Sequence, residues 1–303
     1  MTDILLDETS PSTEVVKGRS LWEDARRRLM RNPAAVVSLY VMAVLVLLAA
    51  FGPFLWVHSY NEIFPDQVAI APTFTDMHLL GTDTVGRDMV ARILYGLGIS
   101  LLVGAAATSV ALTIGVAWGA TAGFLGGFVD EAMMRFVDVL YAIPFVFFVI
   151  VLMTVIQSDD ATANLMLIFM AIGAVEWLTM SRIVRGQAIS LRKREFVEAA
   201  RAAGATPLQI VFRHIVPNVL GPVVVFATLN IPVIILTESF LSFIGLGVQE
   251  PLTSLGRLIK EGTDQMITSP WMLMAPATTM LITLLALNFL GDGLSDALDP
   301  KER

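Results

Sequence analysis

The sequence predicts an all-α, polytopic membrane protein with six transmembrane helices. Its 303 residues are 55% hydrophobic and only 16% charged, with a mean hydropathy of +0.72, whereas a soluble domain has about 25% charged residues. The apolar residues also lie in blocks of about 20, the length that an α-helix needs to cross the hydrocarbon core of a bilayer. A membrane β-barrel would instead show short alternating segments.

Six apolar blocks define the expected spans. The first 33 residues are mostly polar and carry no cleavage site, so we expect the first span to be retained as its own insertion signal. Proline should disturb the third span at Pro144 and kink the fifth at Pro222 and Pro232. The expected spans are 34–57, 99–123, 135–156, 165–184, 219–241 and 271–290.

The distribution of basic residues predicts the orientation. Sixteen of the twenty Lys and Arg residues lie on one side of the predicted spans. Six precede the first span, seven lie between the fourth and fifth, Arg135 borders the connection between the second and third, and Lys301 and Arg303 follow the last. Cytoplasmic segments carry this excess, so both termini should be cytoplasmic. The chain then divides into a cytoplasmic N-terminal tail (1–33), the first transmembrane helix (34–57), an outer loop (58–97), a five-helix membrane domain (98–293) that includes a cytoplasmic loop (185–217), and a cytoplasmic C-terminal tail (294–303).

A short basic helix is expected at Ser20–Arg31. Ser20 and Glu23 form a capping-box pattern, and an apolar face alternates with arginines. This helix either lies along the membrane surface or serves only as a positive topology signal, and both readings stay open. The apolar face consists of Leu21, Trp22, Ala25 and Leu29.

Small residues recur along the second span. Gly115, Gly119 and Gly123 are four residues apart and would allow a neighbouring helix to approach closely. That neighbour is either a helix of this chain, the reading we favour, or a second membrane subunit.

The cytoplasmic loop holds the most informative stretch of the chain. Glu195–Ala203 suits a helix with small side chains and one anchor, Phe196, and Gly204 would end it. A plain connector between spans would not need such a helix. The loop therefore either covers the ends of this chain's own spans or binds another protein.

A second helix should follow Gly204. Thr206 can cap it, Pro207 suits its first position, and Gln209 completes a capping box. Its apolar stripe includes Leu208, Val211, Phe212 and Ile215. Arg213 and His214 suit the negative end of its dipole, and we expect Pro217 to stop it before the fifth span.

The pattern of this loop resembles the EAA loop of bacterial ABC-importer permeases. It has Glu198-Ala199-Ala200, then Gly204 after three residues, and Pro217 thirteen residues later. Over nearly its whole length the chain is similar to the C-type membrane subunit of dipeptide and oligopeptide importers, a pattern that nickel and other small-solute importers share. Further matching segments are Gly81-Thr82-Asp83, Gly86-Arg87-Asp88, Gly126-Gly127 with Asp130, Glu238–Phe243 with Gly245-Leu246-Gly247, and Gly291-Asp292-Gly293 with Asp299-Pro300.

The resemblance implies a type I ABC importer permease fold in the bacterial inner membrane. Such a chain works with a second permease subunit, two cytoplasmic ATPase subunits that bind ATP and Mg, and an extracytoplasmic binding protein that delivers the peptide. It lacks the phosphate-loop pattern, so we expect no ATPase activity of its own. We also expect no cofactor, metal site or nucleic-acid partner on this chain. The resemblance assigns ATPase coupling to Glu195, Phe196, Glu198, Ala199, Ala200 and Gly204.

Four polar residues before the second span are candidates for shaping the surface that meets the binding protein. The alternative, which we favour, is that they cap the second span and that Asp83 pairs with Arg87. The four residues are Thr82, Asp83, Arg87 and Asp88.

Three acids lie at or near membrane depth, where ionisable groups are costly and often functional. Glu176 is the stronger candidate to line the peptide path and meet an amino terminus. Glu238 is a second candidate, although we expect it to bond within the Ser239–Ser242 region. Asp138 should form a structural pair near Arg135.

Two other functional classes compete with an importer subunit. A secondary transporter or channel could use Glu176 or Asp138 as a proton or ion site, but such proteins often show internal repeats, and none is evident here. A membrane scaffold would leave the capped break at Gly204 unexplained.

Overall fold

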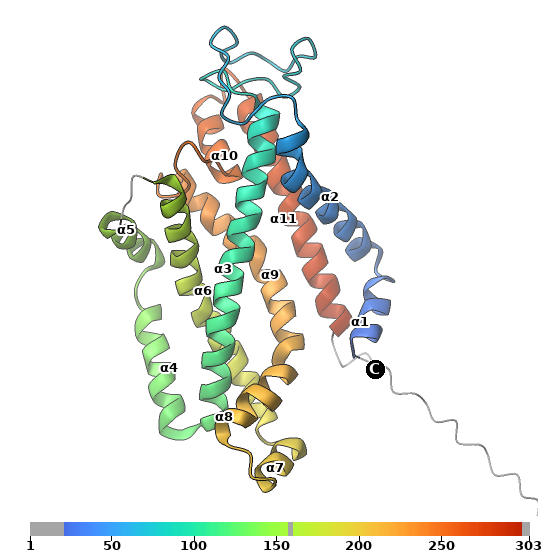
Figure 1. Cartoon of the computed structure of the whole chain (residues 1–303), viewed down its shortest axis with the longest axis vertical. Helices are drawn as coiled ribbons and strands as arrows, with labels where there is room; N and C mark the ends of the chain where they lie inside the picture. The colour runs from blue at the N-terminus through green and yellow to red at the C-terminus, as the bar shows by residue number, and fades with distance from the viewer. Residues whose placement is uncertain (1–20, 157–159, 299–303) are drawn as a thin grey trace, which may run out of the picture.

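The computed structural model describes residues 21–156 and 160–298 as an elongated helical bundle with an irregular loop at one end (Figure 1). Within these residues there is no strand, only an isolated bridge between Thr82 and Asp88. The elements are α1 (Leu21–Leu29), α2 (Pro33–Leu55), α3 (Met89–Leu125), α4 (Gly127–Tyr141), α5 (Phe145–Val155), α6 (Ala161–Leu191), α7 (Glu195–Ala202), α8 (Pro207–Ile210), the π-helical turn η1 (Val211–Ile215), α9 (Val216–Phe243), α10 (Leu255–Asp264) and α11 (Trp271–Leu298).

Five helical segments are long and apolar enough to span a bilayer. They are α2, α3, α6, the segment Pro207–Phe243 and α11. The expected third span passes the same test only as a pair of helices, α4 and α5, with a bend of 78° between them, so the described residues hold six spans if this bent pair counts as one. Pro144 lies at the break as the N-cap of α5, where its missing N–H and the restraint on the preceding residue end α4.

Helices α3 and α6 pack along each other at the centre of the bundle. A Cβ atom on Gly115 would lie 2.6 Å from Cβ of Met180, and one on Gly119 would overlap the carbonyl oxygen of Ser181. Gly115, Gly119 and Gly123 therefore face α6 of the same chain, which confirms internal packing as their role. Close backbone approach is how helices associate where lipid gives no hydrophobic drive.

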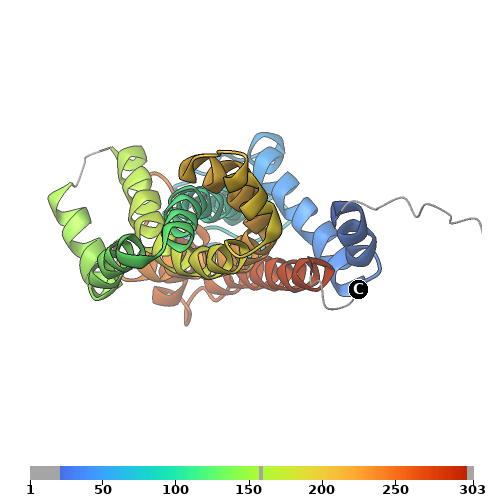
Figure 2. The same ribbon diagram turned by 90° about the horizontal axis from the view of Figure 1, so that it is seen from below.

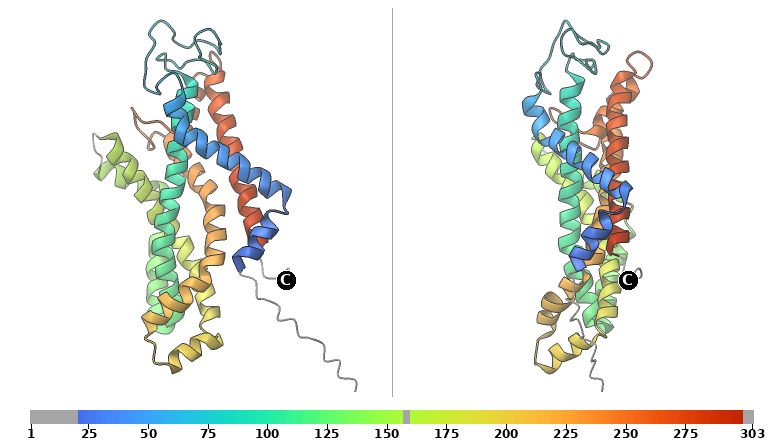
Figure 3. Two further views of the ribbon diagram at one scale, coloured as in Figure 1. Left: turned by 45° about the vertical axis from the view of Figure 1, so that its right-hand side comes forward. Right: turned by 90° about the vertical axis from the view of Figure 1, so that its right-hand side faces the viewer.

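The remaining spans surround this pair. Helix α9 contacts α3, α6 and α11, while α2 contacts both α3 and α11. Seen from below, α4 and α5 lie at one edge and α1 and α2 at the other (Figure 2). Figure 3 shows α2 crossing the bundle obliquely.

The N-terminal helix lies against the end of α11. Ala25, on its expected apolar face, is 4% exposed. Ser20, and with it the expected capping box, lies outside the described residues. The helix itself is confirmed over Leu21–Leu29, and its placement along a membrane surface stays a prediction.

The packing of α3 on α6 yields a matched test with two glycines. Replacing Gly119 by alanine forces the two backbones apart, at a cost of about 1–3 kcal/mol for overpacking, and should lower the thermal unfolding midpoint of the purified protein. A Cβ atom on Gly186 of α6 would meet nothing within 4 Å, so Gly186→Ala should be neutral or stabilising by up to about 1 kcal/mol. Equal midpoints for the two variants would contradict this account.

Candidate functional site

The segment between α6 and α9 places a short helix, α7, at the end of the molecule opposite the irregular loop (Figure 1). Val197 is fully buried and anchors α7, while Glu195, Glu198 and Ala199 are exposed and Phe196 is 37% exposed. Four of the candidate coupling positions thus form an outward face of carboxylates, a small side chain and one aromatic ring, whereas Ala200 is half-buried and packs inward. Such a face can fit closely into a groove on another protein.

A glycine turn follows α7. Gly204 has φ +82, and a Cβ atom there would meet nothing within 4 Å, so the left-handed backbone conformation alone favours glycine. The N–H of Ala205 donates to the carbonyl of Ala200 at 3.1 Å, which closes the helix end as in a Schellman motif. The predicted break at Gly204 is therefore confirmed.

Helix α8 begins with the predicted capping box. The Gln209 N–H donates to Thr206 Oγ1 at 3.4 Å, the Thr206 N–H donates to Gln209 Oε1 at 2.9 Å, and Pro207 lies in the first turn. These contacts satisfy the N–H groups that a helix start leaves unpaired. They also fix the direction in which the chain leaves the turn.

The expectation that Pro217 stops this helix is wrong. The chain passes through the π-helical turn η1 into α9, so Pro207–Phe243 runs as one helical segment. The Val216 N–H donates to the carbonyl of Val211, and Asn218 Nδ2 donates to the carbonyl of His214 at 2.6 Å. The wider turn accommodates a proline in the first turn of α9, so Arg213 and His214 do not lie at a helix end.

A buried apolar cluster joins this segment to the central helices. Val197, Ile210 and Ile215 are at most 1% exposed and pack with residues of α3 and α6. The Arg201 guanidinium also lies over the Phe124 ring of α3, 5.3 Å from its centroid. We call this set the inner cluster; its buried members are Ala120, Phe124, Met180, Val184, Ala188, Val197, Ile210, Val211, Ile215, Val219 and Val223.

Ion pairs hold α4 against α6. Arg185 binds Asp130 through two nitrogens at 2.6 and 2.8 Å, and Arg182 Nη2 binds Asp138 at 2.9 Å. The expected structural pair of Asp138 is present, but its partner is Arg182 and not the nearby Arg135. Helix α6 presents Arg182 to this carboxylate, a tertiary contact that sequence spacing does not reveal.

One intramembrane acid is partly accessible. Glu176 of α6 accepts a hydrogen bond from Asn230 Nδ2 of α9 at 2.8 Å, and both side chains are half-buried. This pair is therefore open on the α6–α9 face of the bundle. A carboxylate exposed to hydrocarbon would be costly, which indicates that this face is covered by protein or water.

The other candidate acid of the path is enclosed. Glu238 is 0% exposed and accepts hydrogen bonds from Ser242 and Ser254 at 2.7 Å each. Ser100 of α3 and Ser239 contribute longer contacts of 3.5 Å. The predicted bonding within Ser239–Ser242 is confirmed, and the carboxylate ties α3, α9 and α10 together rather than facing an open surface.

Charged side chains connect the loop before α3 to α10. Arg92 Nη1 binds Asp83 at 2.6 Å and Glu261 at 2.7 Å, and the expected pair of Arg87 with Asp83 is present at 2.7 Å. Burial raises the pKa of the Asp83 carboxyl, but the charges of Arg92 and Arg87 outweigh it, so this pKa lies below its ordinary value. Asp83 is therefore a carboxylate at neutral pH.

The same pattern continues to Arg257, which binds Glu261 at 2.9 Å and Glu250 at 3.2 Å. Burial raises the pKa of Glu261, but Arg92 and Arg257 outweigh it and hold that pKa below its ordinary value. We call these linked charges the outer network; its members are Asp83, Arg87, Arg92, Glu250, Arg257 and Glu261.

The candidate outer-loop residues mostly point inward. Thr82, Asp83 and Asp88 are at most 1% exposed, and only Arg87 is partly accessible. Asp88 caps α3 through the Ala91 N–H at 2.7 Å and accepts from Trp56 Nε1 at 2.9 Å. These side chains therefore shape the loop surface from within.

Sequence reasoning missed a histidine cluster beside this cap. His78 Nδ1 lies 2.8 Å from Asp88 Oδ2, His78 Nε2 lies 2.6 Å from Gln67 Oε1, and the His58 and His78 rings stack at 4.5 Å. One ligand atom from each of His58, His78 and Asp88 lies within 4.8 Å of the others, but both His78 nitrogens and His58 Nε2, which lies 3.0 Å from the Asp76 carbonyl oxygen, already have hydrogen-bond partners. The geometry therefore fits a hydrogen-bonded cluster better than a metal site.

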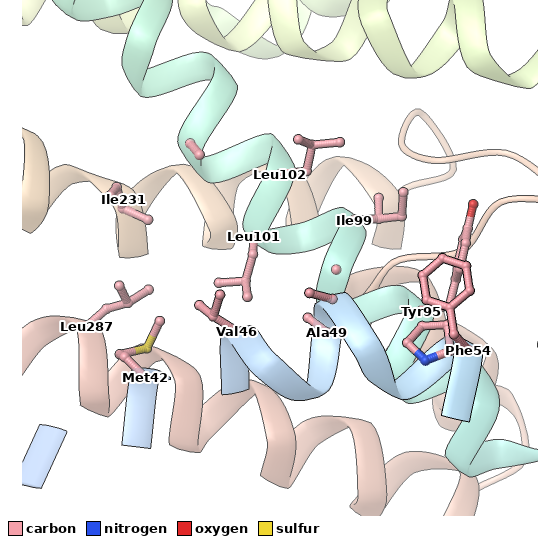
Figure 4. A pocket seen from close by; sticks show the side chains of 14 residues that line it. Met42, Val46, Ala49, Phe54, Tyr95, Ile99, Leu101, Leu102, Ile231 and Leu287 are labelled. Atoms are coloured by element: carbon pink, nitrogen blue, oxygen red, sulfur yellow. The ribbon is translucent and has the colours of Figure 1, made fainter. Parts of the chain in front are cut away.

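A groove of about 590 Å³ lies between α2 and α3 (Figure 4). Its walls are apolar and include Met42, Val46 and Leu102, with Ile231 of α9 and Leu287 of α11 at its side. None of the side chains that line it is charged, so it offers no opposite charge to either end of a peptide.

The whole membrane domain matches a known family. Residues 88–303 match the model of the binding-protein-dependent transport system inner membrane component. The chain belongs to this permease family. Residues 20–72 also match the N-terminal transmembrane domain of oligopeptide transport permease C.

Named relatives cover almost the whole permease. The oligopeptide transport system permease protein OppC of Escherichia coli K12 is 51% identical over 95% of this chain and 94% of its own length, and that of Haemophilus influenzae is 49% identical over 95% and 91%. The dipeptide transport system permease protein DppC of Bacillus subtilis is 39% identical over 99% and 92%.

A solved structure supports the fold. The permease resembles a chain of the inward-facing MetNI methionine ABC transporter with a TM-score of 0.53 at 20% identity, over 70% of this chain and 98% of the other. At this identity the likeness shows the fold alone, which is that of a type I ABC importer permease.

Proposed function

We propose that this permease forms half of the translocation path of an ATP-driven peptide importer. The observation that carries the proposal is helix α7, which has an exposed face, ends at the Gly204 turn and is joined through the inner cluster to the central spans. The relatives named for oligopeptide and dipeptide transport support peptide as the cargo. In this proposal ATP and Mg bind to two partner ATPase subunits and not to this chain.

The proposed orientation places both termini and α7 in the cytoplasm. The excess of Lys and Arg supports it, as does the position of α7 at the opposite end from the loop before α3 (Figure 1). A second permease subunit would complete the path, and an extracytoplasmic binding protein would meet the outer loops, where Arg87 is the accessible candidate.

The coupling mechanism follows from the contacts of α7. An ATPase subunit that holds Glu195, Phe196, Glu198, Ala199 and Ala200 would push α7 when it closes. The inner cluster passes this displacement to α3 and α6, and the helical segment Pro207–Phe243 carries it across the membrane. Packed helices of this kind move as bodies and so alternate between inward- and outward-facing arrangements.

A charge reversal tests this coupling role. Glu198→Lys changes an exposed side chain, so the permease should fold normally, but it places a cation where the ATPase groove meets a carboxylate. Peptide uptake by the assembled importer should fall about tenfold or more, because mismatched interface charges cost several kcal/mol. Glu131→Lys makes the same change at an exposed position of α4 and should transport normally. Full uptake by Glu198→Lys, with ATPase subunits co-purifying as usual, would exclude this role.

The half-buried pair of Glu176 and Asn230 supports a second assignment, in which Glu176 lines the path and meets the amino terminus of the peptide. Glu176→Gln keeps the shape but removes the charge. Uptake of peptides with a free amino terminus should fall roughly tenfold, in keeping with the loss of a charge-assisted hydrogen bond. N-acetylated peptides serve as the control and should lose nothing. Unchanged uptake across peptides of defined length would remove Glu176 from the path.

A further inference from the structure

Two polar cavities adjoin at the segment between α9 and α10. One, of about 170 Å³, is lined by Ser242, Val248, Arg257, Lys260 and Glu261, and the other, of about 410 Å³, by residues of α5 and α6. Gly245 and Gln249 line both cavities. The smaller cavity therefore forms an end chamber beside a larger one, at the same end of the bundle as the outer network.

The end chamber has an excess of positive charge. The outer network contains three arginines and three carboxylates, and all six are paired with one another. Lys260 adds a fourth cation, and among residues 21–156 and 160–298 it forms no ion pair or hydrogen bond. Asp264, one helical turn away, does not pair with it either. One ammonium group is thus available to a ligand in the chamber.

The other polar groups of the chamber are mostly committed. Arg257 donates to Glu261 and to the Val248 carbonyl, and Ser242 Oγ donates to Glu238. Gln249 Nε2 donates to the carbonyls of Gly245 and Gly247 at 3.2 and 3.1 Å. This orients the amide so that its Oε1 atom remains as an acceptor.

We propose that Lys260 and Gln249 form a binding site for the C-terminal end of the peptide on the outer side of the permease. The Lys260 ammonium binds the terminal carboxylate, and Gln249 Oε1 accepts a backbone N–H of the peptide. This inference rests on the peptide-importer function proposed above. It adds recognition of the chain end, which is common to all linear peptides whatever their side chains.

The two adjoining cavities favour a peptide end over an acidic side chain of a binding protein as the source of the carboxylate. The chamber of about 170 Å³ suits the last residue of a chain, and the adjoining cavity of about 410 Å³ would stay empty if only a side chain entered. The larger cavity can then hold the preceding residue. A charge-assisted hydrogen bond in such a partly dehydrated chamber is stronger than one in bulk water.

Uptake by the assembled importer with its binding protein tests the site. At peptide concentrations below half-saturation, Lys260→Gln should transport a tripeptide with a free carboxylate about tenfold more slowly, which corresponds to ~1.4 kcal/mol. Lys260→Arg should retain most of the rate. A C-terminally amidated tripeptide should move at the same rate in Lys260→Gln as in the unchanged protein. Equal slowing of both peptides, or no slowing, would overturn the inference, whereas absence of any peptide uptake by the unchanged protein would instead refute the proposed function.

If the binding protein does not accept the amidated peptide, uptake cannot compare the two peptides. A labelling experiment then tests the site directly. The chain has no cysteine, so Leu246→Cys introduces a unique thiol in the adjoining cavity, and mass spectrometry of this chain reports its modification in the assembled importer. The free-carboxylate tripeptide should slow modification of the thiol at this position, and the amidated one should not. Adding Lys260→Gln should abolish the protection. Protection that persists without Lys260, or no protection by the free-carboxylate peptide, would contradict the site.

Discussion

The close approach of α3 and α6 is the contact on which the rest of this permease depends. Gly119 and Gly123 allow the two backbones to touch, and dispersion contacts at this distance replace the hydrophobic drive that a bilayer does not supply. The inner cluster forms at one end of this pair, because α3 and α6 together provide the surface on which Val197 and Ile210 pack. The α7 helix is therefore held by the centre of the bundle and not by a flexible connector.

The buried carboxylates at both Asp83 and Glu238 are compensated by neighbouring polar or charged groups. Buried carboxylates are stable only when charges or hydrogen bonds compensate them, and here Asp83 has two arginines and Glu238 a shell of serine hydroxyls. Against this background Glu176 and Lys260 stand out among the half-buried groups of the described residues, because neither has an ion-pair partner there. One is a half-buried acid and the other an unpaired cation, which are the charges needed to bind opposite ends of a peptide.

Much of the fold follows from local signals in the sequence. Apolar length predicts the spans, and capping chemistry at Thr206, Pro207 and Gln209 predicts how the chain leaves Gly204, because these interactions involve neighbours within a few residues. The sequence-based predictions fail where a residue distant in the sequence determines a contact, or where a second local geometry competes with the predicted one. Asp138 takes Arg182 instead of Arg135, Glu238 also binds Ser254 and Ser100, and a π-helical turn carries the chain past Pro217.

The proposed coupling requires that α7 and the segment Pro207–Phe243 move as one body. Because the chain has no cysteine, spin labels can be placed at Ala202 on α7 and Val233 on α9, both exposed, and their separation measured by pulsed electron paramagnetic resonance in the assembled importer. We expect this distance to agree within about 2 Å between the nucleotide-free and ATP-bound states, while the distance from Val233 to the second permease subunit changes. An intrachain change of about 5 Å, one helical turn, would show that the connection bends and would contradict the account.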